Sequence, residues 1–424
     1  MAAELDYSEE KKPGNGTLTL LCVGHGSTHF VFAATIMLAP YIRQTSGLNY
    51  LEVTSLGTLY YAAAFLANFL SGYLVDAFKK RMAVQLASLT LAGGGMIVSG
   101  ISGFYLDGTQ VFVMLAIGWA LCGMGNQAWH PAAFAYLAKY YKDRRGFVFS
   151  MHVVSANAGD AIFPLIAGFL LGHIFVEASG HQMWSPVSLV AGIPCLLTAL
   201  ILGRYVAKHG DEVVKVRSQA MSANSYFKGY VALLRNGHAM LLALVGGLRN
   251  ASQTALLYFL PLYMVDILFS GPVLVGTALT LLQVGGMISA PIAGIASDRS
   301  GERPVVFSCL AITTVVLVLA LFVKNPTYFV FLIALVGLAL YAVRPVVQSW
   351  MMDLVSSDFR GSATSVMFGV QSFMNVIFLF ISGYVADLFG LVIVFYIITS
   401  VILFANILTF FLPKPYNVRQ VGKC

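Results

Sequence analysis

Three formally charged side chains lie inside long apolar stretches of this 424-residue chain: Arg249, Arg344 and Asp160. A guanidinium group stays protonated and presents a planar fork of donors that matches a carboxylate, phosphonate or phosphate. A carboxylic acid can bind and release a proton when its surroundings change. An ionisable residue at bilayer depth costs on the order of 3 kcal/mol and by default faces a cavity. We therefore interpret the two arginines as binders of a small organic anion and Asp160 as a carrier of protons.

Polar side chains also recur four residues apart, a spacing that puts both members of a pair on one face of a helix. The pairs are His25 and His29, Asn126 and His130, Arg249 and Gln253, Arg344 and Gln348, and Gln371 and Asn375. Histidine changes its charge near neutral pH, so the imidazoles are candidates for moving protons. We predict substrate contacts from Arg249, Arg344, His130, Asn126, Gln253 and Gln348, with Tyr258 and Tyr341 as cavity walls. We predict proton coupling through the titratable groups of Asp160, His130, His29 and His25.

The arginines also have structural interpretations. Arg249 could form an ion pair with Asp160 inside the protein. Arg344 could snorkel towards the membrane surface, or hold backbone carbonyls that the following Pro345 leaves without a donor. Under these alternatives neither arginine would bind substrate.

The histidines have structural interpretations of the same kind. His130 precedes a proline and could cap a broken helical turn. His25 and His29 could simply form hydrogen bonds with neighbouring helices. His152 follows Gly146 by only six residues, near the expected membrane interface, and is left outside the site.

The composition places the chain in a lipid bilayer. Hydrophobic residues make up 58% and charged residues only 10%, whereas a soluble protein has roughly 25% charged residues. The continuous apolar runs exclude a soluble enzyme, a disordered chain and an outer-membrane barrel. We predict an all-α membrane protein with twelve spans near residues 17–42, 53–76, 82–105, 110–138, 147–173, 184–207, 239–265, 273–296, 304–323, 327–352, 361–387 and 390–412.

The basic residues predict the orientation of these spans. Twenty-one Lys and Arg fall in the terminal segments and the connections on one side, and only Arg43 and Lys324 fall on the other. The positive-inside rule therefore places both termini in the cytoplasm of a multi-pass inner (plasma) membrane protein. The net charge of +7 therefore reflects this topology and does not indicate binding to nucleic acid.

The two halves of the chain repeat one another. The recurring blocks are Gly26 with Pro40 and Gly247 with Pro261, His130-Pro131 and Arg344-Pro345, and Gly146 with Gly168 and Gly361 with Gly383. The offsets are 221, 214 and 215 residues, which is too steady for chance. Under the repeat, His29 corresponds to Asn250 and Asp160 to Asn375. Parallel repeats of this kind are one architecture for alternating access.

The repeat also predicts the domain organisation. Six-helix bundles are expected at residues 17–207 and 238–412, joined by a cytoplasmic linker at 208–237. Cytoplasmic tails at 1–16 and 413–424 flank them.

A short motif follows the second span of each half. The sequences GYLVDAFKKR (72–81) and GIASDRSGERP (294–304) resemble the G-x-x-x-D-R-x-G-R-R loop of the major facilitator superfamily. The first copy departs from the pattern, with Ala77 and Lys79 where Arg and Gly are usual. The resemblance implies gating, in which the aspartate latches one conformation by pairing with a cation or a helix N-terminus. The implied gating residues are Gly72, Asp76, Arg81, Gly294, Asp298, Arg299 and Arg303.

A narrower resemblance rests on the segment that follows His130-Pro131. Its G-x-x-x-S-x(6)-N-x-G-x(4)-P-L pattern comprises Gly146, Ser150, Asn157, Gly159, Pro164 and Leu165. It is similar to the fosmidomycin-resistance branch of drug and organic-anion exporters. The resemblance implies a secondary active transporter of a small organic anion. The titratable Asp160 and histidines predict coupling to protons, and we expect one chain to suffice for transport.

The sequence also allows two other functions. One is a proton-coupled exporter of neutral or cationic drugs, in which Asp160 meets the cation, and the other is a sensor built on a transport fold. No Walker sequence, HExxH or GxSxG motif is present, so we expect no ATP-driven pump and no enzyme. The five cysteines lack metal-binding spacing, and we expect neither a metal site nor a cofactor.

Overall fold

The computed structural model describes residues 14–78, 80–177, 182–210, 235–355 and 360–413. These residues are almost entirely helical, and their only strand-like feature is an isolated bridge between Val176 and Gln182. The predicted all-α class is confirmed. Both predicted tails lie almost entirely outside the described residues, as does most of the predicted linker.

The first six predicted spans form six long helices. They are α1 (Asn15–Ser46), α2 (Tyr50–Phe78), α3 (Arg81–Tyr105), α4 (Gly108–Tyr140), α5 (Arg145–Phe169) and α6 (Trp184–His209). A 3-10 turn, η1 (Lys142–Arg144), precedes α5, and a π-helical turn, η2 (Leu170–Ile174), follows it. We refer to α1–α6 as the N-terminal half.

The other six spans form the C-terminal half, α8–α14. Its helices are α8 (Gly237–Asp266), α9 (Pro272–Ser300), α10 (Glu302–Phe322), α11 (Pro326–Leu340), α12 (Val343–Asp353), α13 (Arg360–Phe389) and α14 (Leu391–Leu408), followed by η4 (Thr409–Phe411). The tenth predicted span is thus broken into α11 and α12 at Tyr341 and Ala342.

Eleven of the described helical segments are long and apolar enough to cross a membrane, with α11 and α12 counted as one. The predicted span outside that set is α8, which has polar residues at its centre, among them Arg249, Asn250 and Gln253. Polar residues in the middle of a span reduce its hydropathy, and they mark a face turned to a cavity or to other helices.

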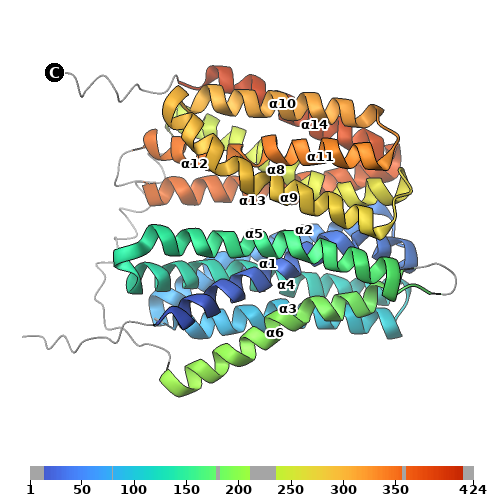
Figure 1. Cartoon of the computed structure of the whole chain (residues 1–424), viewed down its shortest axis with the longest axis horizontal. Helices are drawn as coiled ribbons and strands as arrows, with labels where there is room; N and C mark the ends of the chain where they lie inside the picture. Colours follow the sequence, from blue (N-terminus) through green and yellow to red (C-terminus); the bar gives the residue numbers. More distant parts are fainter. Residues whose placement is uncertain (1–13, 79, 178–181, 211–234, 356–359, 414–424) are drawn as a thin grey trace, which may run out of the picture.

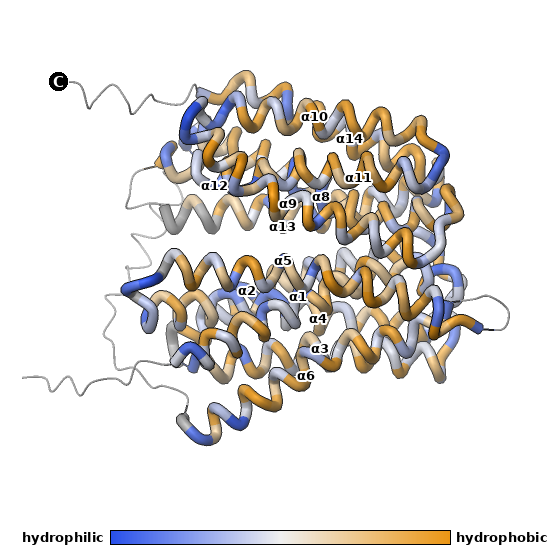
Figure 2. The backbone as a smooth tube through the Cα atoms, in the orientation of Figure 1, coloured by the Kyte–Doolittle hydropathy of each residue, from blue (hydrophilic) through white to orange (hydrophobic). Residues whose placement is uncertain are grey.

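Figure 1 shows the two halves as two adjacent groups of helices, with α1 beginning and η4 ending on the same side of the molecule. Apolar residues dominate the middle of the helices, and hydrophilic residues gather towards their ends (Figure 2). This distribution is the one a bilayer requires, since its core is about 30 Å thick and excludes unpaired polar groups.

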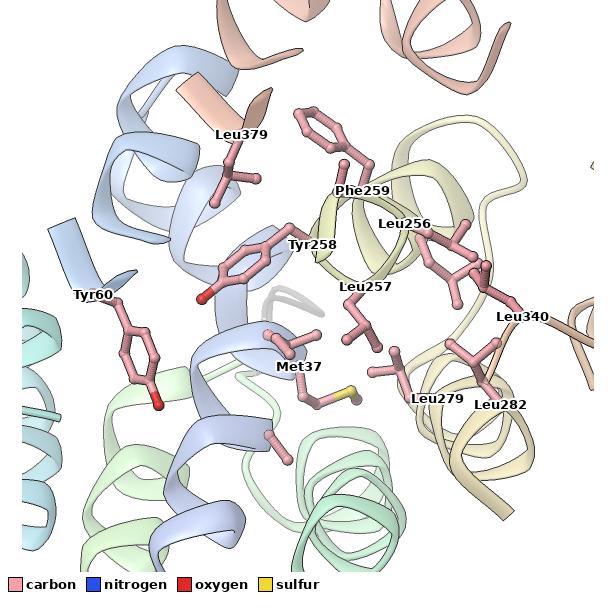
Figure 3. Packing of buried hydrophobic residues seen from close by; sticks show 14 of the residues in the cluster. Met37, Tyr60, Leu256, Leu257, Tyr258, Phe259, Leu279, Leu282, Leu340 and Leu379 are labelled. Atoms are coloured by element: carbon pink, nitrogen blue, oxygen red, sulfur yellow. The ribbon is translucent and has the colours of Figure 1, made fainter. Parts of the chain in front are cut away.

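The halves meet mainly along two pairs of helices, α2 with α13 and α5 with α9, and α1 also contacts α8. Glycines permit both approaches. A Cβ at Gly276 of α9 would lie 2.1 Å from the Pro164 carbonyl oxygen, and a Cβ at Gly383 of α13 would collide with Thr54. Buried apolar residues of both halves form one cluster, part of which Figure 3 shows around Tyr258 of α8.

Candidate functional site

The break between α11 and α12 exposes a backbone carbonyl that Arg249 binds. Pro345 has no N–H, and the Arg344 N–H bonds to the Tyr341 oxygen, so the Leu340 oxygen has lost its helical donor. The Arg249 side chain of α8 fills this position with two donors, Nε at 3.0 Å and Nη2 at 2.5 Å from the Leu340 oxygen. Arg249 is 2% exposed. It therefore supports the helix break, the role that sequence alone had offered for Arg344.

Arg344 has the opposite environment. Its side chain is exposed, and its guanidinium makes no hydrogen bond or ion pair with any residue that the structure describes. The carboxylate of Asp160 in the N-terminal half acts on it electrostatically, so Arg344 faces that half. Because a guanidinium offers five donors, this one is available to a ligand.

The space directly between the two arginines is small. A cavity of about 10 Å³ is lined by Arg249, Arg344, Gln348 and neighbouring residues of α8 and α13. That volume admits about one water molecule. In this conformation an organic anion could not lie between the two guanidinium groups, and only the exposed side of Arg344 is free to meet one.

Four histidines gather where α1, α4 and α5 meet. His25 Nε2 and His130 Nε2 lie 3.3 Å apart, and the His25 and His29 rings meet edge to face at 4.8 Å. The fourth ring, His152, stacks on His25 at 3.7 Å. The structure thus brings together three residues that the spacing had singled out, from the facing helices α1 and α4.

The expectation that His152 lies outside the site is wrong. His152 is fully buried, its backbone oxygen is 2.7 Å from His25 Nδ1, and its ring nitrogen Nε2 accepts a hydrogen bond from Trp129 Nε1 at 3.1 Å. Counting residues from Gly146 placed it near the membrane surface. A usable signal was its separation from Asp160, because eight residues are about two helical turns and put both on one face of α5.

Asp160 is the carboxylate of this cluster. Its Oδ2 lies 2.9 Å from His29 Nδ1, with the two side chains 9% and 20% exposed. The corresponding residues of the C-terminal half are also in contact, since Asn250 Nδ2 donates to Asn375 Oδ1 at 3.0 Å. Asp160 therefore pairs with a histidine, and the predicted alternative of an Arg249–Asp160 ion pair is wrong in this conformation.

The other predicted site residues fall into two groups. Asn126 donates to the Thr28 carbonyl of α1 at 3.2 Å and serves helix contact. Tyr258 is 1% exposed, with its hydroxyl 3.4 Å from Thr35 Oγ1, so it fills the interface between the halves. Gln253, Gln348 and Tyr341 are partly buried around the two arginines, where Tyr341 lies under Arg249 at 5.9 Å.

Sequence reasoning missed the contacts that close one end of the interface. Asp266 at the end of α8 forms an ion pair with Arg43 at 2.7 Å and accepts hydrogen bonds from Gln44 at 3.0 Å and the Tyr50 hydroxyl at 3.1 Å. Asp387 of α13 accepts the backbone N–H groups of Tyr50 and Leu51 at the start of α2. These bonds join the halves at the end remote from the start of α1.

The gating motif lies at the other end of the helices. Asp298 and Arg299 are exposed and make no hydrogen bond or ion pair with the described residues, so the second copy forms no latch there. Arg303 Nη2 instead donates to the Phe410 carbonyl at 2.6 Å. Arg81 Nε and Nη1 are buried without a partner in the described part of the chain. The side chain of Asp76 lies outside the described residues.

The motif glycines, Gly72 and Gly294, occupy open positions. A Cβ at either would meet no atom within 4 Å. In this conformation they do not serve close helix packing.

A large cavity lies elsewhere. A space of about 670 Å³ is bounded by α1, α5 and α6, with a lining that is mostly apolar and includes Val23, Phe147 and Ile162. These side chains are about half exposed. The cavity does not coincide with the predicted anion site, because neither Arg249 nor Arg344 lines it.

Two groups of membrane helices that meet around charged residues at mid-depth define a transporter of small solutes. The chain belongs to the Major Facilitator Superfamily, whose model matches residues 21–277 and again residues 242–423. The two overlapping matches agree with the internal repeat. The family is one of transporters and not of enzymes.

Several curated proteins are similar to this chain. The Escherichia coli membrane sensor protein UhpC is 23% identical over 68% of this chain and 65% of its own length. A probable hexose phosphate transport protein of Chlamydia pneumoniae is 25% identical over 41% of this chain and 34% of its own. The glucose-6-phosphate exchanger SLC37A2 of Danio rerio is 23% identical over 49% and 48%. The chain thus covers less than two thirds of each of these relatives.

Solved structures share the fold. A bacterial homologue of the human lysosomal transporter Spinster, in an inward-facing and unoccupied conformation, gives a TM-score of 0.76 at 13% identity over 94% of this chain and 96% of its own. The nucleoside transporter NupG gives 0.74 at 13% identity over 93% and 99%. At this identity the likeness concerns the fold alone. The resemblance to the fosmidomycin-resistance branch stays a prediction.

Proposed function

We propose that the protein is a secondary active transporter of a small organic anion of the phosphate-ester class. The observation that carries this proposal is the exposed guanidinium of Arg344, which has no partner among the described residues. Leaving such a cation unpaired at bilayer depth is costly, so an anionic ligand offsets the cost. Two of the similar proteins are named for hexose phosphate or glucose-6-phosphate, which supports this class of anion.

The arrangement of the halves supports alternating access. The ion pair and hydrogen bonds of Asp266 close one end, while Asp298 at the other end makes no latch within the described structure. Rocking of residues 17–207 against 238–412 would open the first end and close the second. In this proposal both termini lie in the cytoplasm, the protein resides in the inner membrane, and one chain suffices for transport.

Coupling to protons through Asp160, His130, His29 and His25 remains a prediction. So does the remaining substrate set, Asn126, Gln253, Gln348, Tyr258 and Tyr341. A second function is favoured by one similar protein, the membrane sensor UhpC. A sensor would bind the anion and would not move it.

Reconstituted protein separates these functions. Liposomes loaded with inorganic phosphate or glucose 6-phosphate are diluted into the labelled compound, and exchange is measured over time. We expect exchange in wild type, loss in Arg344→Gln, and weaker binding in Arg344→Lys, since lysine keeps the charge without the fork. Arg204→Gln, at an exposed position on α6, is the matched control and should exchange normally.

Each result has a distinct meaning. Binding without exchange would assign a sensor. Exchange of a cationic drug that survives Arg344→Gln and fails in Asp160→Asn would assign the cation exporter and contradict the anion proposal.

A further inference from the structure

Three of the clustered histidines are spaced as ligands of one ion. The Nε2 atoms of His25 and His130 are 3.3 Å apart. Each of these residues, and His29 with them, offers a ligand atom within 4.8 Å of the other two. Two nitrogens bound to a tetrahedral ion at roughly 2.0–2.1 Å lie about 3.3–3.4 Å from each other. The first two imidazoles already have this separation, and the third would have to approach them by up to about 1.5 Å.

The hydrogen bonds of two rings leave their Nε2 lone pairs free. His25 Nδ1 lies 2.7 Å from the backbone oxygen of His152, which can only accept, so the proton sits on Nδ1. His29 Nδ1 donates in the same way to Asp160 Oδ2 at 2.9 Å. His29 Nε2 is buried and has no hydrogen-bond partner among the described residues. In metal sites a ligating histidine almost always donates its other N–H to a carbonyl or carboxylate, as both rings do here.

Packing fixes the orientation of the ring at the centre. The His152 ring stacks on His25 with an interplanar angle of 16°. Trp129 Nε1 in turn holds His152 Nε2 at 3.1 Å. A preformed arrangement of this kind spares a ligand the cost of ordering the side chains.

Hydrogen bonds among the imidazoles alone would satisfy fewer of the buried ring nitrogens than a bound ion would. A proton shared by His25 and His130 satisfies one nitrogen of each ring. It leaves His29 Nε2 buried without a partner in the described structure, and an ion bound by this nitrogen would satisfy it. Buried polar atoms without partners are uncommon and call for a ligand, an ion or water.

We propose that His25, His29 and His130 bind one divalent transition-metal ion of the kind that favours imidazole ligands, such as Zn²⁺, Co²⁺ or Ni²⁺. Asp160 and His152 hold two of the ligating rings. The site goes beyond anion transport and does not depend on it.

The site belongs to one half of the chain. Under the repeat, the positions of His25, His29 and His130 correspond to Gly246, Asn250 and Arg344, which cannot form such a set. All three ligands come from α1 and α4, so alternating access would not dismantle the site.

Metal binding to purified protein tests this proposal. Full-length protein in detergent, without an affinity tag and stripped by a chelator, is dialysed against Co²⁺ or Zn²⁺ and its metal content is measured. We expect one ion per chain and visible Co²⁺ absorption bands that report nitrogen ligands. His29→Ala and His130→Ala should abolish the bands, and Asp160→Asn should weaken affinity by about 10- to 100-fold without changing the stoichiometry.

Two histidines outside the cluster supply the controls. His173 and His238 are exposed, so the His173→Ala and His238→Ala variants should bind metal as wild type does. His25 is buried, so if its variants do not fold, the partly exposed His29 decides the question. Uptake by wild type that does not exceed uptake by a folded His29→Ala variant would overturn the proposal. Because no transport is measured, failure here leaves the anion proposal standing, and the reverse also holds.

Discussion

The imidazole Nδ1 of His29 lies 2.9 Å from Asp160 Oδ2, and the contact has a counterpart in the other half, where Asn250 Nδ2 donates to Asn375 Oδ1 at 3.0 Å. The paired residues are related by the repeat offsets of 221 and 215. Both halves therefore keep one hydrogen bond between their first and fifth spans. The bond joins two helices in each half, but only in the N-terminal half is it formed by ionisable groups.

Asp160→Asn should leave the fold stable. The amide oxygen can accept the His29 N–H as Asn375 accepts Asn250, so we expect the free energy of unfolding to change by less than about 1 kcal/mol. Asp160→Leu removes the acceptor, leaves a buried N–H unsatisfied, and should cost about 1–3 kcal/mol. Thermal unfolding in detergent measures both, with Asn375→Asp as the matched control. Equal losses in the two Asp160 variants would contradict the shared architectural role.

Substitutions of the two arginines should have different effects on the free energy of unfolding. Arg249→Leu leaves the Leu340 carbonyl without a donor, so we expect a loss of about 1–3 kcal/mol. Arg344→Gln removes no contact made by the described residues, and should change stability by no more than about 0.5 kcal/mol. Unfolding midpoints measured without ligand compare them. A larger loss in Arg344→Gln would show that its guanidinium has a structural partner.

Much of the fold could be predicted because its signals are local. Apolar runs of bilayer length located every span, and steady offsets revealed the two halves. The break between α11 and α12 was harder to predict from the sequence. A proline at Pro345 predicts an unsatisfied carbonyl, but only the packing of α8 against α11 decides that Arg249 satisfies it.

The site was harder to predict because its contacts join distant segments. Helix spacing put His25 and His29 on one face, but it cannot give the depth at which α4 and α5 bring His130 and His152 to them. The proposed metal site escapes sequence motifs for the same reason, because the spacing within one segment does not relate His130 to His25 and His29. Asp266 ended an apolar run and gave no sign that its partners lay more than two hundred residues away.

Asp266→Ala should favour opening of the end of the molecule that it closes. The substitution removes an ion pair with Arg43 and the hydrogen bonds from Gln44 and Tyr50, which join α8 to α1 and α2. The groups are partly exposed, so we expect a loss of about 1–2 kcal/mol and a shift of the conformational equilibrium of roughly five- to thirty-fold.

Spin labels at Tyr105 and Phe269 can measure that shift. Both side chains are more than 80% exposed, and they lie at this end of α3 and just beyond α8. The distance between labels should lengthen in a larger share of molecules for Asp266→Ala. Lys324→Ala, an exposed charge that makes no such bond in the described structure, should match wild type. Identical distance distributions in all three proteins would show that Asp266 does not hold the end closed.

Gly276→Ala should disturb the contact between α5 and α9. A Cβ there would lie 2.1 Å from the Pro164 carbonyl oxygen, which belongs to backbone and cannot rotate away. We expect the unfolding free energy to fall by about 1–3 kcal/mol as the helices separate. Gly294→Ala is the control on the same helix, because its Cβ would meet nothing within 4 Å and alanine favours helix by up to about 1 kcal/mol. Thermal unfolding compares the two. Since both substitutions have the same effect on chain flexibility, a difference between them isolates the close approach, whereas equal midpoints would mean that α5 can move aside at no cost.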